Sequence, residues 1–206
     1  MVIPTSIAAR SAGPQTGSDG KRVVDQDVRS SAAEPTTSAV LAPVYRDRDG
    51  ELRVLLVQRG TRGIHGGQIG LPGGKREPSD RSLLDTAVRE AEEEIGLARE
   101  RVEILTPLEP LDTMTTGFRV HAYLARITPP LHWRPAAGEI AGIVTPTVRA
   151  LTDPSSRQQR KLSFPTWPTS RRVECVRLDQ GQLLWGLTLR LLDPLLPRLL
   201  AGEWGI

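Results

Sequence analysis

The sequence predicts an α/β (or α+β) layered domain. Short strand-like segments are interspersed with one clear amphipathic helix and some shorter helical stretches, an order typical of layered mixed folds. With 206 residues, the chain suits one compact domain plus a tail rather than two full domains. Hydrophobic residues make up 38% of it, which is enough for a real core although aromatics are scarce at 4%.

The first 36 residues differ in composition from the remainder. They are rich in Ser, Ala, Thr, Gly and Asp and show no sustained hydrophobic periodicity. We expect residues 1–36 to be a flexible N-terminal tail and residues 37–206 to form the domain.

The domain begins with a predicted β-hairpin. Residues 38–45 and 52–59 read as strands, and Asp47-Arg48-Asp49-Gly50 reads as the turn between them. A glycine-rich loop, residues 60–74, follows the second strand and ends in the pair Gly73-Gly74.

The clearest helix runs from Asp80 or Ser82 to Ile95. Apolar residues at helical spacing form one stripe along it: Leu84, Val88, Ala91 and Ile95. Asp80 and Ser82 are both candidate N-caps, and Gly96 can end the helix in a left-handed conformation.

Further elements follow this helix. We expect strands at residues 102–105, 118–127 and 139–144, a short helix near 148–151, and a strand around Cys175. Residues 183–200 are predicted to be helical, with Pro194 and Pro197 breaking or bending the helix.

Composition excludes or disfavours several classes of protein. The formal charge is only +3, and the basic residues are scattered, so nucleic-acid binding is not indicated. No apolar run is long enough for a membrane span, and residues 1–10 make a poor secretion signal. Cys175 is the only cysteine, which excludes an internal disulfide and fits a reducing compartment. We therefore expect a cytoplasmic protein without a membrane partner.

Glutamates on the predicted helix form the candidate metal site. Glu90 lies beside Glu93 and Glu94, three and four residues further on, where like charges repel each other. Mg²⁺ would relieve that repulsion, because it prefers carboxylate oxygens and shares its coordination shell with water and phosphates. Glu92 points elsewhere and reads as a surface charge, whereas Arg89 precedes Glu93 by one turn and can hold its carboxylate.

The glycine pair strengthens this interpretation. Gly73 and Gly74 allow the backbone to approach a metal or phosphate closely, and a carbonyl there, as at Gly74, can supply another oxygen ligand. The alternative is an ordinary exposed acidic helix face after a glycine loop. The joint pattern is far more specific than the glutamates alone.

That joint pattern resembles the Nudix box. The box runs from a glycine through five residues to Glu, then seven residues, then Arg-Glu-apolar-x-Glu-Glu-x-Gly-apolar, which residues 89–97 match. Asp80 stands in place of the first Glu, and eight residues rather than seven separate it from Arg89. The longer spacer looks like the coenzyme A pyrophosphatase branch, and its upstream signature is similar to residues 59–74, where His65, Gly67, Gln68 and Ile69 fit. Leu71 replaces the usual Phe, and the second Arg is displaced by one position.

Further resemblance appears downstream, at residues 111–113, 116–120 and 184–188, so that the likeness covers about residues 38–200. It implies an α/β/α sandwich with a mixed β-sheet against which the box helix packs. It also implies a pyrophosphohydrolase that uses Mg²⁺ or Mn²⁺ to split a nucleoside diphosphate linked to another group, here coenzyme A or its derivatives.

The resemblance also assigns roles. Glu90 and Glu94 are the expected principal metal ligands, and Glu93 is either a third ligand or the group that orients water. Glu93 and Glu139 are candidates for the general base, although Glu139 equally suits a structural salt bridge.

Four residues are candidates for contacting the substrate. Arg59 and Arg62 follow a strand into the glycine loop and can contact phosphates. Gln68 and His65 belong to the upstream signature, and His65 is more typical of a hydrogen-bonding loop residue than of a base.

Two alternatives remain open at this level. One is a Nudix hydrolase for ADP-ribose or an oxidised nucleoside triphosphate. The other is a domain that senses a nucleotide without cleaving it, which the presence of all three box glutamates disfavours. The sequence does not fix the oligomeric state.

Overall fold

A computed structural model describes residues 36–61, 66–113, 117–163 and 167–206. The predicted tail therefore lies almost wholly outside the described residues, as do Arg62 and His65. The described residues all belong to one unit, Glu34–Ile206.

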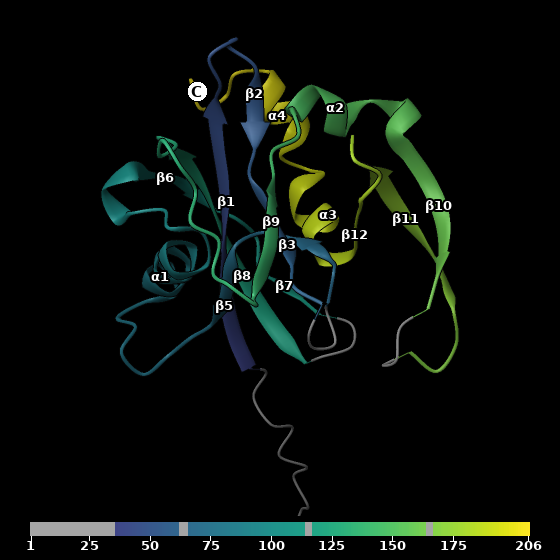
Figure 1. The fold of residues 1–206 in the computed structure, drawn as a ribbon, viewed down its shortest axis with the longest axis horizontal. Coiled ribbons are helices and arrows are strands. Elements are labelled where there is room, and N and C mark those ends of the chain that lie inside the picture. The colour runs from purple at the N-terminus through teal and green to yellow at the C-terminus, as the bar shows by residue number, and fades with distance from the viewer. Residues whose placement is uncertain (1–35, 62–65, 114–116, 164–166) are drawn as a thin grey trace, which may run out of the picture. The chain divides into compact units, whose positions relative to one another are not determined.

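The largest sheet is mixed and has six strands. Its central strands are β1 (Thr36–Arg46) and β8 (Phe118–Ile127), which run parallel (Figure 1). The other strands all pair antiparallel: β2 (Leu52–Val54) and β5 (Gly73–Lys75) with β1, and β6 (Val102–Pro107) and β7 (Leu111–Asp112) with β8.

Two smaller antiparallel sheets complete the strands. One has the order β4-β3-β9, with β3 at Leu56–Arg59, β4 at Ile69–Gly70 and β9 at Ile140–Val144. The other has the order β10-β11-β12, with β10 at Arg157–Leu162, β11 at Arg171–Arg177 and β12 at Leu183–Trp185. The long β10–β11 hairpin extends away from the central strands (Figure 1).

The central strands bury side chains on both faces. Ala39 and Leu41 of β1 pack in a cluster with Ala91 and Ile95 of α1 (Leu83–Ile95). The alternate residues Ala42 and Val44 face a second cluster. Because successive strand side chains point to opposite faces, both faces of the sheet must be covered.

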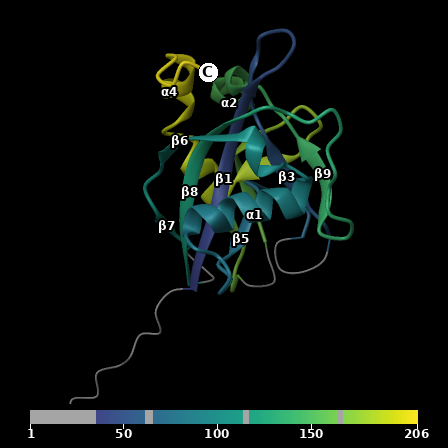
Figure 2. The same ribbon diagram turned by 90° about the vertical axis from the view of Figure 1, so that its left-hand side faces the viewer.

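Helices supply that cover on the two sides. The second cluster draws on α2 (Val148–Thr152), α3 (Gly186–Leu192) and α4 (Leu196–Leu200). Figures 1 and 2 show α1 across the central strands from α3. The expected α/β/α layering with a mixed sheet is therefore confirmed, and short 3-10 turns at Arg99–Arg101 and Pro154–Ser156 join its parts.

Helix α1 is held at both ends as its sequence predicts. The Ser82 hydroxyl caps the first turn by accepting from the Asp85 N–H at 3.0 Å, and Gly96 ends the helix at φ 70°. Of the two predicted N-caps, the prediction of Ser82 is confirmed and that of Asp80 is wrong. Ser82 is extended immediately before the helix, whereas Asp80 binds other partners.

Two further expectations are wrong in part. Residues 52–59 are two strands rather than one, because the chain leaves the first sheet after Val54 and pairs with β9 from Leu56 onward. Residues 183–200 begin as strand β12 and not as helix. Leu184 pairs with Val176 of β11, and that pairing overrides the local helical pattern. Pro194 follows α3, and Pro197 lies in the first turn of α4, so the expected break is confirmed.

Candidate active site at the glycine strand and the acidic helix

The site forms where β5 meets α1. Strand β5 contains Gly73 and Gly74 and is called the glycine strand below, and α1 is called the acidic helix. Gly73 has φ 152°, and a side chain there would overlap the backbone of Ala39 in β1. Gly74 has no space for a side chain either, because a Cβ would overlap the Glu90 carboxylate. The absence of side chains at the two glycines thus lets the backbone lie against the acidic helix.

Glu94 is the most deeply placed of the glutamates, only 2% exposed. Its Oε2 accepts a hydrogen bond from the Gly73 N–H at 3.0 Å. Its Oε1 is buried and has no hydrogen-bond partner among the described residues. Burial raises the pKa of Glu94 to about 7, although the Gly73 N–H and the charge of Arg59 act in the opposite direction.

Glu90 lies one turn earlier on the same face. Burial also raises the pKa of Glu90, opposed chiefly by the charge of Arg89, whose Nη2 lies 3.0 Å from Glu90 Oε1. The charge of Glu90 raises the pKa of Glu94, and the charges of Glu93 and Glu139 raise the pKa of Glu90, since negative charges close together disfavour ionisation.

Arg89 organises the acidic residues around it. It donates to Glu93 Oε2 at 2.8 Å, as expected from their spacing, and to the Lys75 carbonyl at 3.1 Å. It also binds Asp80, which is almost fully buried, through Nε at 2.9 Å. These bonds tie the loop before α1 to the helix.

The remaining predicted residues lie at different distances from this centre. Arg59, at the end of β3, has its Nη2 at 3.9 Å from Glu139 Oε1, and both side chains are partly exposed. The positive charge of Arg59 lowers the pKa of Glu94, and the negative charge of Glu139 raises it. Glu92 is exposed on the outer face of the helix, as expected.

The donor set fits a hard divalent cation. Glu90, Glu94 and a carbonyl of the glycine pair offer oxygen atoms, the ligands that Mg²⁺ and Mn²⁺ prefer. The unpartnered, buried Glu94 Oε1 is the strongest observation, because a buried carboxylate oxygen without a partner is costly. In the described part of the chain, no three His, Cys, Asp or Glu side chains already converge as a full metal cage. Glu90 and Glu93 are instead bonded to Arg89.

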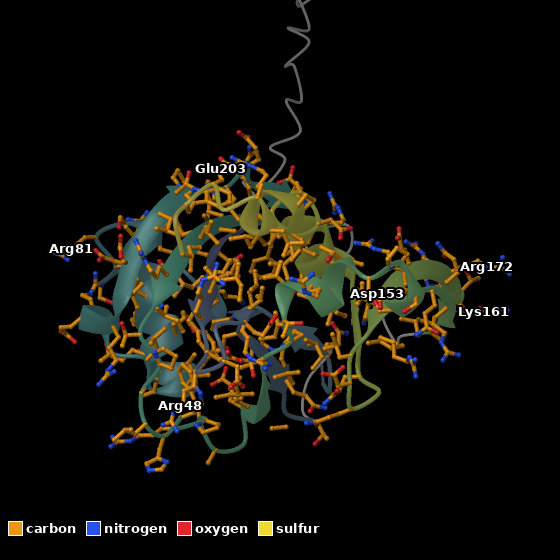
Figure 3. The ribbon with its side chains drawn as sticks, turned by 90° about the horizontal axis from the view of Figure 1, so that it is seen from above. Arg48, Arg81, Asp153, Lys161, Arg172 and Glu203 are labelled. Carbon is orange, nitrogen blue, oxygen red and sulfur yellow. The ribbon has the colours of Figure 1, made fainter. Side chains whose placement is uncertain are left out.

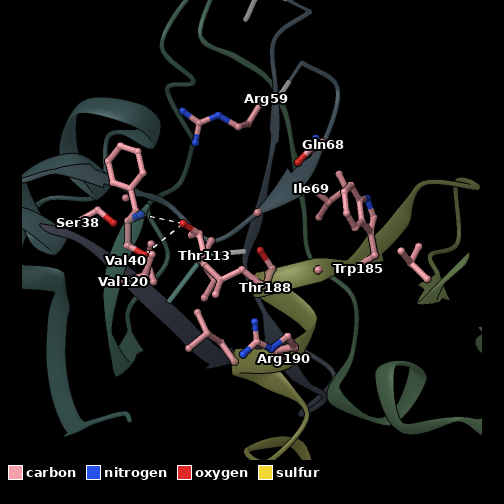
Figure 4. Close-up of a pocket in the computed structure, with 18 of the residues that line it drawn as sticks. Ser38, Val40, Arg59, Gln68, Ile69, Thr113, Val120, Trp185, Thr188 and Arg190 are labelled. Atoms are coloured by element: carbon pink, nitrogen blue, oxygen red, sulfur yellow. Dashed lines mark hydrogen bonds between the residues drawn. The ribbon is translucent and has the colours of Figure 1, made fainter. Parts of the chain in front are cut away.

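A cavity of about 590 Å³ opens beside the glycine strand. Gly73, Gly74, Arg59 and Gln68 line it, so the predicted substrate contact Gln68 belongs to its wall. Figure 4 shows Arg59 and Gln68 on one side of this cavity and Arg190 on the opposite side.

Sequence reasoning missed much of this wall. Residues to which the sequence alone gave no role line the cavity: Lys75, Thr113, Phe118, Trp167, Arg171, Arg172, Trp185, Thr188 and Arg190. The signal that could have found some of them is the segment 167–172, where a tryptophan stands close to a pair of arginines.

Comparisons with known proteins show the family of the chain. The model of the NUDIX domain matches residues 35–163, more than half of the chain, and the chain belongs to the Nudix hydrolase family. The protein is 42% identical over 108 residues to the uncharacterized Nudix hydrolase NudL of Citrobacter koseri, covering 52% of this chain and 54% of that protein. It is 30% identical over 174 residues to NudL of Pectobacterium atrosepticum, covering 75% and 84%. The chain therefore spans only about half of the first relative's length.

The fold has a counterpart among solved structures. A MutT/nudix family protein from Enterococcus faecalis is similar with a TM-score of 0.52 at 16% identity, over 82% of this chain and 62% of that one. No helix in the described ranges is long and apolar enough to cross a membrane.

Proposed function

We propose that this protein is a metal-dependent pyrophosphohydrolase whose substrate is coenzyme A or a derivative of it. The observation that carries the hydrolase part is the buried Glu94, whose Oε1 has no partner among the described residues, beside a glycine strand that lines a large cavity. The preference for coenzyme A rests on the longer spacer between Asp80 and Arg89 and on the signature that surrounds Gln68.

Each residue of the site has a proposed role in binding the metal or the substrate. Glu90 and Glu94, with a carbonyl of Gly74, would hold Mg²⁺ or Mn²⁺. When bound, such an ion neutralises the diphosphate and lowers the pKa of a coordinated water. Arg89 donates hydrogen bonds to the carboxylates of Glu90 and Glu93 and would hold both in place. Arg59 would contact a phosphate, which its position in the cavity lining supports.

Water would attack one phosphorus of the diphosphate, and the bond from that phosphorus to the bridging oxygen would break. The oxygen of water stays on the attacked phosphate, and the bridging oxygen leaves with the other. Glu93 and Glu139 are the candidates that accept the proton of water. Both are exposed enough to exchange it with solvent. For coenzyme A the products are 3′,5′-ADP and 4′-phosphopantetheine.

A substrate panel tests this proposal. Coenzyme A, ADP-ribose, NADH and nucleoside triphosphates would be incubated with the purified chain and Mg²⁺ or Mn²⁺, and products separated by chromatography. We expect coenzyme A to have the highest kcat/KM and no turnover with a chelator. Faster turnover of ADP-ribose or a triphosphate would support the alternative Nudix hydrolase. No turnover of any compound would favour a nucleotide sensor.

A further inference from the structure

The cavity has an aromatic end that the proposed chemistry does not use. Trp167 and Trp185 meet edge to face, with ring centroids 5.8 Å apart and planes at 85°. Both side chains are only partly buried, and both line the cavity. A planar base can therefore pack against indole surface at this end, as bases do on aromatic side chains elsewhere.

The wall of the cavity as a whole is strongly basic. The described wall of the cavity contains Arg59, Lys75, Arg171, Arg172 and Arg190, and no aspartate or glutamate. Arg59 pairs with Glu139. Arg171 and Arg190 make no ion pair with any described carboxylate, whereas the neighbouring Arg157 pairs with both Glu174 and Asp193. Cations without carboxylate partners along a cavity favour an anionic ligand.

Two of these arginines, Arg171 and Arg190, lie on elements that neighbour each other at the cavity, β11 and α3. The Arg171 guanidinium carbon lies 5.4 Å from the Trp167 ring centroid, which holds this side chain at the aromatic end. Arg190 comes from α3, which packs against β11 and β12, and Figure 4 shows it on the opposite side of the cavity from Arg59. Arg172, next to Arg171 on β11, also lines the cavity, and Figure 3 shows it near Lys161 at the outer end of the β10–β11 hairpin.

We propose that the aromatic end, formed by Trp167, Trp185, Arg171 and Arg190, binds a nucleoside that carries a phosphate in addition to the diphosphate. The base would pack on the indoles, and Arg171 and Arg190 would bind the additional phosphate. This assignment rests on the proposed function, in which the glycine strand takes the diphosphate. Of the two halves of coenzyme A, pantetheine is uncharged, so only the 3′-phosphorylated nucleoside calls for the two arginines.

Binding of the nucleotide alone tests the proposal without catalysis. The full chain, without metal, would be titrated calorimetrically with 3′,5′-ADP and with 5′-AMP, which differ only in the additional phosphate. We expect 3′,5′-ADP to bind about 10-fold more tightly or better, because a phosphate bonded to two arginines gains charge-assisted hydrogen bonds. Equal affinities in the parent protein would overturn the proposal, and this comparison requires no variant.

Variants test which side chains cause the preference for 3′,5′-ADP over 5′-AMP. Arg171→Ala and Arg190→Ala should each reduce the ratio of the two affinities toward one, and 5′-AMP should bind almost as before. Lys161→Ala is the matched control, because it removes one positive charge from the same hairpin at a residue opposite Arg172 and outside the cavity wall. A ratio that is unchanged in both arginine variants, or that falls equally in the control, would show that these side chains do not bind the phosphate.

Turnover then separates this proposal from the proposed function. With Mg²⁺, coenzyme A would be compared with dephospho-coenzyme A, which lacks the 3′-phosphate. Hydrolysis of both at equal kcat/KM would overturn the inference and leave the proposed function standing. Hydrolysis of neither, with a retained preference for 3′,5′-ADP, would contradict the proposed function and support the phosphate site.

Discussion

The absence of a side chain at Gly74 leaves room for the Glu90 carboxylate beside the glycine strand. Gly74→Ala would introduce a Cβ into the volume of the Glu90 carboxylate, and Glu90 would have to turn away. Because a carboxylate is the end of a flexible side chain, we expect a small change in stability and a fall in kcat/KM of about 10-fold or more. Steady-state hydrolysis at saturating Mg²⁺ measures the second quantity.

Gly142→Ala provides the control for that substitution. Gly142 lies in β9, and a Cβ there would meet only the side chain of Gln58 at an ordinary distance of 3.9 Å. Its activity should stay close to that of the parent. If Gly74→Ala were equally active, the glycine pair would not be needed to admit the Glu90 carboxylate.

Asp80 supports the site through charge. Its carboxylate accepts from Arg89, Thr86 and the Glu77 N–H, and the Arg89 guanidinium holds the pKa of Asp80 well below its usual range. Since the folded pKa lies below the unfolded value of about 3.9, the stabilisation is complete at neutral pH and is lost as the pH falls through and below that value.

Asp80→Asn should therefore destabilise the protein near pH 7, by on the order of 1–3 kcal/mol. The difference from the parent should shrink in chemical denaturation series below about pH 4, where the unfolded aspartate is protonated. Asp49→Asn, in the exposed hairpin turn, serves as control. A difference that does not vary between pH 7 and pH 3 would mean that shape, and not charge, makes Asp80 important.

Helix α1 depends on its cap for the register of its glutamates. Ser82→Ala removes the acceptor for the Asp85 N–H and should cost about 1 kcal/mol of unfolding free energy. Thermal melting compared with Ser79→Ala, three residues earlier at an exposed position, would measure this. Equal melting temperatures for the two variants would show that tertiary packing alone fixes the first turn.

The elements that were predicted well are those whose periodicity and burial agree. Residues 118–127 match β8 in full, because β8 is a central strand that alternates between two buried clusters. The helix ending at Ile95 was equally clear. Strands β4 and β5 lie inside the glycine-rich loop, where two or three residues carry no periodic signal. Their pairing with β3 and β1 depends on contacts distant in sequence.

The site residues also differ in how well the sequence predicts them. Glu90, Glu93, Glu94 and Arg89 share one helix, so their spacing in sequence gives their proximity in space. The aromatic end of the cavity assembles from the β10–β11 hairpin, β12 and α3. Nothing in local spacing relates Trp167 to Trp185, although their rings meet edge to face in the folded chain.

At the scale of the whole molecule, the domain is expected to be independent of its N-terminal segment. The sequence of residues 1–35 has no packing pattern, and the described residues contain both buried clusters. A variant lacking residues 1–35 should keep its melting temperature and kcat nearly unchanged. A large fall in either quantity, measured by thermal melting and steady-state hydrolysis, would show that the segment packs on the domain or completes the site.

The central claim is that the buried face of α1 binds the catalytic cation. Glu94→Gln keeps size and the capacity to accept from the Gly73 N–H, but removes the charge of the carboxylate whose Oε1 has no described partner. Glu92→Gln makes the same chemical change on the exposed face of the helix.

The most direct measurement is the hydrolysis rate of the two variants beside the parent, with Mg²⁺ titrated in each. We predict that Glu94→Gln lowers turnover at least about 10²-fold, near 2.7 kcal/mol of transition-state stabilisation, and weakens the Mg²⁺ dependence. It should fold as well as the parent, because it relieves the repulsion with Glu90. Glu92→Gln should stay within a few-fold of the parent. Equal and small effects at both positions would show an ordinary acidic helix and contradict the account.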